Sequence, residues 1–143
     1  MATAREGYSG TPLARKLGIA SGHRVALLGA PAGIEDLLAP LPGDVRLLRR
    51  ARAPIDVALL FVHDAAALRR RLPAAQAAMT PAGALWVAWP KRASGVPTDV
   101  TEDVVRAAGL ARGLVDTKVC AVDATWSGLR LVTRLRDRPR RRG

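Results

Sequence analysis

The chain has 143 residues, of which 49% are apolar, and this is the size of one domain with a single core. Its single cysteine excludes a framework of disulfides within the chain. The net charge of +11 points toward nucleic acid, but +6 of it lies between Arg130 and Gly143, and aromatic residues for base stacking make up only 3%.

Several classes of protein and site are disfavoured. No apolar stretch approaches the roughly 20 residues that cross a bilayer, and the N-terminus has no hydrophobic signal region, so we expect a cytoplasmic protein with no membrane partner. The histidines and the cysteine lie far apart in the sequence, which disfavours a metal site. No Gly-Lys-Ser or Gly-Lys-Thr of a phosphate-binding loop occurs. Cys120 lies in an apolar run and is expected to be a buried, inert thiol.

The two ends differ in composition from the rest. Residues 1–7 predict a disordered start, residues 8–135 one α/β domain, and residues 136–143 an arginine-rich, disordered tail. Arginine outnumbers lysine by 20 to 3 amid abundant alanine, which indicates a coding bias as much as selection for a partner. Whether the tail is functional stays open, and no oligomeric state is predicted.

Short helices and strands alternate in the first third of the chain. A helix is expected over residues 12–17, with Thr11 as its N-cap and a proline at its first position. The apolar run 24–28 is typical of a strand buried on both faces. A helix over residues 34–38 and a strand over residues 45–48 follow.

The middle of the chain predicts the central strand at residues 57–62. Asp64 can then cap a helix in which Pro73 predicts a kink or a break. Arginines 69–71 are interpreted as solvated surface of this helix, because the apolar residues follow one other face, namely Leu68, Leu72, Ala75 and Met79.

The last elements are a strand, a helix and a hairpin. Residues 80–83 are expected to turn the chain before a strand at residues 84–89 and a polar loop. Asp99, with Glu102 three residues later, has the pattern of a capping box for a helix that Gly109 ends. Runs 114–122 and 129–135, joined by a turn, predict an antiparallel hairpin.

This order predicts a single Rossmann-like α/β domain: a mostly parallel sheet with a C-terminal antiparallel hairpin and helices on both faces. Ligands of such sheets bind at the carboxyl edge where the strand order reverses, here between strands 24–28 and 57–62. The candidate ligand-binding residues on segments that reach this edge are Gly29, Gly33, His63, Asp64, Lys91, Arg92, Ser94, Gly95, Asp123, Trp126 and Ser127.

Some of these residues have two interpretations. The basic loop from Lys91 to Gly95 could bind an anion or be merely solvated. His63 and Asp64 could form an acid/base pair, but a strand end and a helix cap explain them equally, and we favour that structural interpretation. Trp126 could stack on a planar ligand or cover the end of the sheet, and both remain open.

Residues 12–33 and the closing hairpin resemble class I methyltransferases that use S-adenosylmethionine. The resemblance implies three spaced glycines after the first strand and an acid after the second for the ribose hydroxyls. Here the loop is Gly29-Ala-Pro-Ala-Gly33, and the second strand ends in Arg49-Arg50. The missing acid and the two cations argue against this cofactor, and the sequence names no other.

Three motifs resemble those of a bacterial family classed as a domain of unknown function, numbered 3052. They are Tyr-Ser-Gly-Thr-Pro-Leu at residues 8–13, the loop of residues 89–95, and residues 123–130. The likeness covers nearly the whole chain except the tail. It implies a Rossmann-like, methyltransferase-like frame and carries over no activity.

The leading hypothesis is a domain that binds a small anionic ligand, with nucleotide-like ligands among the candidates. One alternative is a module that binds nucleic acid or an acidic partner through the tail arginines Arg136, Arg138, Arg140, Arg141 and Arg142. Another is a degenerate transferase with Asp64 or Asp123 as its base. Whether the protein is an enzyme stays open.

Overall fold

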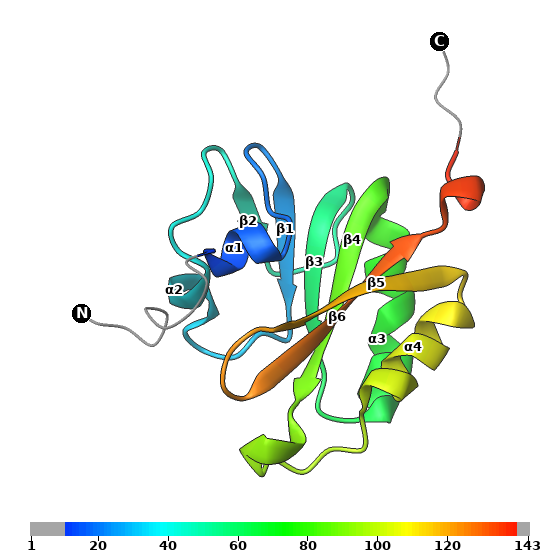
Figure 1. Ribbon diagram of the computed structural model, residues 1–143. Coiled ribbons are helices and arrows are strands. Elements are labelled where there is room, and N and C mark those ends of the chain that lie inside the picture. The colour runs from blue at the N-terminus through cyan, green and yellow to red at the C-terminus, as the bar shows by residue number, and fades with distance from the viewer. Residues whose placement is uncertain (1–10, 140–143) are drawn as a thin grey trace.

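The computed structural model describes residues 11–139 of the chain. Its strands are β1 Arg24–Leu28, β2 Arg46–Leu48, β3 Ile55–Phe61, β4 Met79–Pro90, β5 Leu114–Ala121 and β6 Trp126–Thr133. Its α-helices are α1 Leu13–Lys16, α2 Ile34–Leu38, α3 Ala65–Ala78 and α4 Glu102–Leu110, and the 3-10 helices are η2 Arg92–Ser94 and η3 Leu135–Asp137. Figure 1 shows these elements around one sheet.

The sheet has the order β2-β1-β3-β4-β6-β5. The strands β2, β1, β3 and β4 are parallel, whereas β6 runs antiparallel to both β4 and β5. The predicted mostly parallel sheet with a C-terminal hairpin is therefore confirmed. The strand order reverses between β1 and β3, where the sequence placed the reversal.

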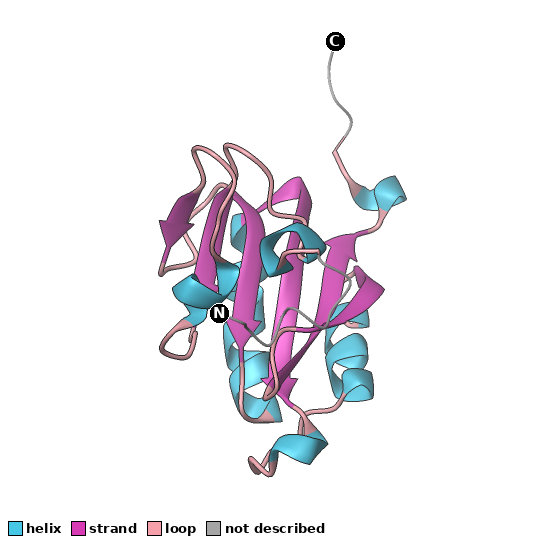
Figure 2. Cartoon of the chain, turned by 60° about the vertical axis from the view of Figure 1, so that its left-hand side comes forward, coloured by secondary structure: helices cyan, strands magenta, loops and turns pink. Residues whose placement is uncertain are grey.

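Helices lie on both faces of the sheet, as predicted (Figure 2). One face packs on α3 and α4 through a core that includes Leu68, Leu72 and Val105. The other packs on α1 and α2 through a second core around the fully buried Trp86. The indole Nε1–H of Trp86 donates to the carbonyl oxygen of Leu17 at 2.9 Å, which fixes the end of α1 against the sheet.

The first half of the sheet and its helices agree closely with the sequence pattern. β1 and α2 have their predicted bounds, while β2 and β3 differ by one or two residues at an end. α1 begins at Leu13, and Pro12 rather than Thr11 is its N-cap, with no side-chain cap. Asp64 caps α3 as expected, since its Oδ1 accepts from the N–H of Ala67 at 2.7 Å.

α3 continues from Ala65 to Ala78 through Pro73, so the predicted break is wrong. Leu68, Leu72, Ala75 and Ala78 are buried on one face, and this packing stabilises the helix on both sides of the proline. Residues 80–83 also differ from the prediction, because they belong to β4 and do not form a turn. A Cβ on Gly83 would lie 3.0 Å from the Ile55 carbonyl oxygen, so glycine allows β3 to approach at the register shift there.

α4 differs from its prediction at both ends. Thr101 is the N-cap, accepting from the N–H of Val104, whereas Asp99 accepts from the N–H of Ala65 at 2.8 Å and so serves α3. Gly109 lies inside α4 and is buried. A Cβ there would lie 3.1 Å from the Leu131 side chain, so this glycine allows α4 to pack closely on β6.

The hairpin turn is shorter than predicted. Trp126, Ser127 and Gly128 are strand residues of β6, paired with the end of β4. The Asp123 carboxylate makes the turn tight by accepting from the N–H groups of Thr125 and Trp126, both at 2.8 Å.

At the C-terminal end, the predicted boundary at residue 136 falls inside η3. The rest of the predicted tail, residues 140–143, and the predicted disordered start lie outside the described residues. Within residues 11–139, no helix has the length and apolar character needed to cross a bilayer.

Candidate functional site

The carboxyl edge of the sheet gathers the segments that the sequence analysis singled out (Figure 1). The N–H of Lys91, after β4, donates to the Thr125 carbonyl oxygen of the hairpin turn at 2.7 Å. The Trp126 ring contacts Phe61 and His63 edge-on, with ring centroids 5.0 and 5.1 Å apart. The ends of β3 and β4 and the start of β6 therefore meet, as parallel-sheet topology predicts.

Trp126, His63 and Asp64 have structural roles at this edge. Trp126 is 6% exposed and covers the end of the sheet, so its indole face is not offered to a ligand. The Asp64 carboxylate is occupied with capping α3. His63 is exposed and packs against the edge of the Trp126 ring. This arrangement fits the structural interpretation of the His63-Asp64 pair.

The loop after β1 places a cation where a cofactor loop would need space. Gly29 has φ +65°, and a Cβ on it would lie 2.7 Å from Nη1 of Arg71, so the guanidinium from α3 lies against the loop backbone. Arg71 is thus half-buried against the loop, in contrast to its predicted solvated position. Gly33, with φ +87°, is the N-cap of α2.

The end of β2 carries a second obstacle to the cofactor of class I methyltransferases. Arg49 follows β2 and forms a salt bridge with Glu35 of α2, which occupies the nearest carboxylate. The residues at the β1 and β2 ends therefore do not fit this cofactor.

The residues of the basic loop after β4 line two different cavities. The Ser94 hydroxyl donates to the Lys91 carbonyl oxygen at 2.6 Å and accepts from the N–H of Val96, so it stabilises the 3-10 turn η2. Arg92 and Gly95 line a hollow of about 420 Å³ toward the start of α4. Lys91 lines a different, larger cavity. The predicted convergence of Lys91, Arg92 and Ser94 on one anion therefore does not occur.

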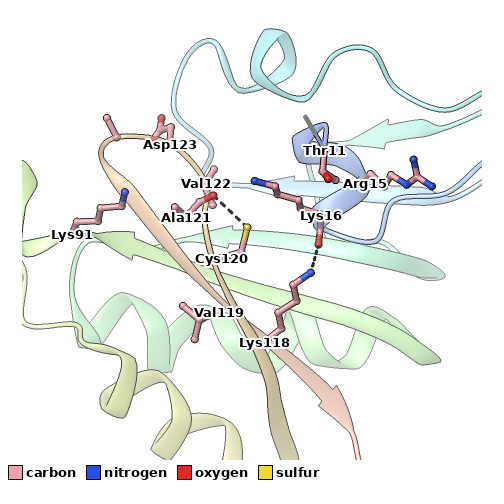
Figure 3. Close-up of a pocket in the computed structure, with 11 residues that line it drawn as sticks. Thr11, Arg15, Lys16, Lys91, Lys118, Val119, Cys120, Ala121, Val122 and Asp123 are labelled. Carbon is pink, nitrogen blue, oxygen red and sulfur yellow. Dashed lines mark hydrogen bonds between the residues drawn. The ribbon is translucent and has the colours of Figure 1, made fainter. Parts of the chain in front are cut away.

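The larger cavity, which we call the basic hollow, has a volume of about 640 Å³ and lies between α1 and the β5–β6 hairpin (Figure 3). α1 and Thr11, two residues before it, supply one wall, β5 and the hairpin turn supply the floor, and Lys91 lies on the far side. Its lining residues are Thr11, Arg15, Lys16, Lys91, Lys118, Val119, Cys120, Ala121, Val122, Asp123 and Ala124.

All three lysines of the chain, Lys16, Lys91 and Lys118, line the basic hollow. The Lys118 ammonium donates to the Lys16 carbonyl oxygen at 3.4 Å, which links β5 to the end of α1. Figure 3 shows the Lys16 ammonium directed across the hollow toward Val122, whereas the Arg15 guanidinium points away from its centre. Three ammonium groups therefore surround a floor of small and apolar side chains.

Two further side chains define the chemistry of the basic hollow. Among the lining residues within 11–139, Asp123 is the only carboxylate, and one of its oxygens is held by the turn. Cys120 is half-buried rather than buried as expected, because β5 is the edge strand of the sheet. Burial raises the pKa of the Cys120 thiol, while the positive charges of Lys16 and Lys118 oppose the rise.

Sequence reasoning found Lys91 and Asp123 but missed Arg15, Lys16 and Lys118 as site residues. The only sequence signal for the two lysines is that the chain has far fewer lysines than arginines. That composition does not indicate which residues lie close together in the fold. No group of three or more metal-ligating side chains occurs among residues 11–139.

Comparison with solved structures shows a Rossmann-like methyltransferase frame. Ribosomal protein L11 methylase from Lactobacillus delbrueckii subsp. bulgaricus aligns with a TM-score of 0.55 at 12% identity, covering 85% of this chain and 74% of that one. TrmN from Thermus thermophilus gives 0.56 at 15%, covering 85% and 47%. The ChlM magnesium protoporphyrin IX methyltransferase from Synechocystis PCC 6803, with bound SAH, gives 0.54 at 11%, covering 85% and 78%.

These identities are low, so the likeness concerns the fold alone. The chain also spans less than half of the length of TrmN. No curated protein matches the sequence.

Family membership follows from the sequence itself. Residues 33–135, from the N-cap of α2 to the start of η3, match the family described as "Protein of unknown function (DUF3052)". The family resemblance that the three motifs indicated is thereby confirmed. The chain belongs to this family.

Proposed function

We propose that this domain binds a small anionic ligand in the basic hollow. The observation that carries the proposal is the position of Lys16, Lys91 and Lys118, which come from three distant parts of the sequence and line one cavity. A volume of about 640 Å³ is within the range of small-ligand sites. Like charges around one cavity repel one another, and a bound anion relieves that repulsion.

The lining narrows the class of ligand. Ammonium groups are compact charges with rotatable donors, and lysine is a common ligand of phosphate oxygens in proteins. Val122 and Ala121 offer apolar contact on the floor between the charges. We therefore expect a phosphorylated metabolite with an uncharged body, and nucleotides belong to this class.

The test is a thermal-shift screen of the full chain against nucleotides and phosphorylated metabolites, followed by calorimetry on each ligand that responds. Lys91→Met and Lys118→Met should each weaken binding by roughly tenfold or more, because each removes a charge-assisted hydrogen bond. Arg52→Met removes the same charge from an exposed connector and should leave binding unchanged. No response to any phosphorylated compound, or equal losses in all three variants, would contradict the proposal.

An altered transferase is the second candidate, favoured by the methyltransferase frame and by Asp123 in the wall of the basic hollow. Asp123 would be its base, since it lines the basic hollow and Asp64 does not. Calorimetry with S-adenosylmethionine and S-adenosylhomocysteine separates the candidates. If either compound binds and the Lys118→Met variant loses that binding, the result would favour the transferase. If neither compound gives a heat of binding, the result would favour the anion-binding domain.

A further inference from the structure

We propose that the end of β6 and the segment after it bind the phosphate backbone of nucleic acid. The surface, which we call the arginine strip, consists of Arg130, Arg134, Arg136 and Arg138, and the sequence continues with Arg140, Arg141 and Arg142. This function is separate from ligand binding in the basic hollow. β6 starts at the hairpin turn beside the hollow and ends at the opposite edge of the sheet, where η3 follows (Figure 1).

Tertiary contacts hold part of the arginine strip in place. Arg138 Nε donates to the Thr133 carbonyl oxygen at 3.1 Å, so the chain after η3 folds back toward β6. Arg130 Nη1 donates to the Thr117 hydroxyl at 3.1 Å, and Arg130 lies opposite Lys118 in the β5–β6 register. The cationic side chains of Arg130, Lys118 and Arg138 are thus held on or next to the β5–β6 pair.

The electrostatics of the arginine strip are unfavourable in the isolated domain. Burial and the positive charge of Arg138 lower the pKa of Arg130 below its ordinary value. Among residues 11–139, every salt bridge uses Arg49 or Arg106, so no described carboxylate lies within 4 Å of an arginine of the strip. A bound polyanion would supply the missing negative charge.

The surroundings favour a phosphate backbone over an acidic protein. Protein interfaces usually have an apolar core with aromatic residues. The large apolar side chains exposed in the described part of the chain are only Leu110, Val119 and Leu135, and no aromatic ring is among them. Leu135 in η3 is the one of these beside the arginine strip, and a single apolar side chain does not form such a core. Guanidinium groups pair with phosphate and carboxylate oxygens alike, so the lack of an apolar core decides between the two partners. Because no Trp or Phe ring is exposed among residues 11–139 to stack on bases, binding should be independent of sequence and strongly salt-dependent.

The test is fluorescence anisotropy of the full chain with a labelled, short, mixed-sequence DNA duplex and the same sequence as single-stranded RNA, over about 50 to 200 mM salt. Arg130→Gln/Arg138→Gln should weaken binding and reduce the slope of log Kd against log salt by about 2. The control variant Arg69→Gln/Arg70→Gln, on the exposed side of α3, makes the same change in net charge. It should leave the affinity and the salt slope nearly unchanged.

A second variant guards against misfolding, because Arg130 is partly buried. Arg136→Gln/Arg138→Gln leaves β6 intact and should also reduce the slope, with a far-UV spectrum equal to the parent's. Equal losses in the strip variants and the α3 control would overturn the proposal, since binding would then follow net charge alone. Competition by polyglutamate as effective as by unlabelled duplex would overturn it in favour of an acidic protein partner.

Discussion

The two faces of the sheet are covered to different extents. The face under α3 and α4 carries helices of 14 and 9 residues, which extend over β3, β4, β6 and β5. Among residues 11–139, the opposite face carries only α1 and α2, of 4 and 5 residues, and the part of it over β5 and the hairpin forms the basic hollow. Burial stabilises the first face, whereas the described helices leave part of the second face open.

This difference shows how a small domain can combine a stable core with a partly open sheet surface. Where a helix covers the sheet, both the helix and the sheet remove apolar surface from water, and this burial stabilises the fold. An uncovered stretch forgoes that gain and exposes strand side chains such as Lys118 and Cys120 to whatever occupies the cavity. Substitutions on the two faces should therefore differ in what they affect.

The largest expected effect is on the covered face. Leu68→Ala removes a side chain that is 1% exposed between α3 and the sheet, and should lower the free energy of unfolding by about 2–5 kcal/mol in urea denaturation. Cys120→Ala, on the floor of the basic hollow, should cost less than about 1 kcal/mol, because one side of the thiol faces open space. Similar costs for the two variants would show that the faces are equally packed.

A smaller effect is expected where α1 joins the sheet. Trp86→Phe leaves the buried Leu17 carbonyl oxygen without its donor and should cost about 1–3 kcal/mol. Trp89→Phe makes the same change on the covered face, where the indole N–H donates to no acceptor among residues 11–139, and is its control. Denaturation curves that coincide for the two variants would contradict a role for the hydrogen bond in holding α1.

The cap of α3 should contribute less again. Asp64→Ala removes the acceptor for the N–H of Ala67 and should cost about 0.5–2 kcal/mol, whereas Asp64→Asn keeps an acceptor and should cost less. Neither variant should alter binding in the basic hollow if Asp64 is purely structural. Calorimetry on both variants with a ligand from the screen checks this expectation, and loss of binding in each would restore the acid/base interpretation.

The smallest effect concerns the reactivity of Cys120. Since burial raises the pKa of its thiol, iodoacetamide should modify it more slowly than an exposed thiol near neutral pH, and the rate should rise with pH. Lys118→Met removes a charge that stabilises the thiolate and should slow modification severalfold further. Lys91→Met should not alter the rate. Mass spectrometry over time gives the rates, and a faster reaction in Lys118→Met would contradict this electrostatic environment.

Local signals explain which elements could be predicted. β1 and α2 were found at their observed bounds because an apolar run between glycine-rich loops is a strong signal that later packing does not alter. Asp64 caps the helix that directly follows it, so the local sequence is sufficient to predict this role. Asp99 failed as a cap because Thr101 competes two residues later, and the pattern cannot choose between them.

The errors arose where distant residues decide the local structure. Residues 80–83 have turn composition but extend β4, since Gly83 fits closely against β3. Gly109 has the signature of a helix end but lies inside α4, where its lack of a side chain accommodates Leu131. Pairing with β4 makes Trp126 a strand residue and buries it. None of these partners is near in sequence.

By itself the sequence determined the frame: alternating apolar runs and helix signals specify a mostly parallel sheet, its order of elements and the family. Only the tertiary structure decided the site, because Lys16, Lys91 and Lys118 are far apart in the chain and no local pattern relates them. The short α1 leaves part of the sheet uncovered, and the hairpin returns beside Lys91 through the Thr125 hydrogen bond. The spacing of apolar residues along the sequence indicates which side chains are buried. Whether the three lysines line one cavity depends on how the helices and the hairpin pack on the sheet.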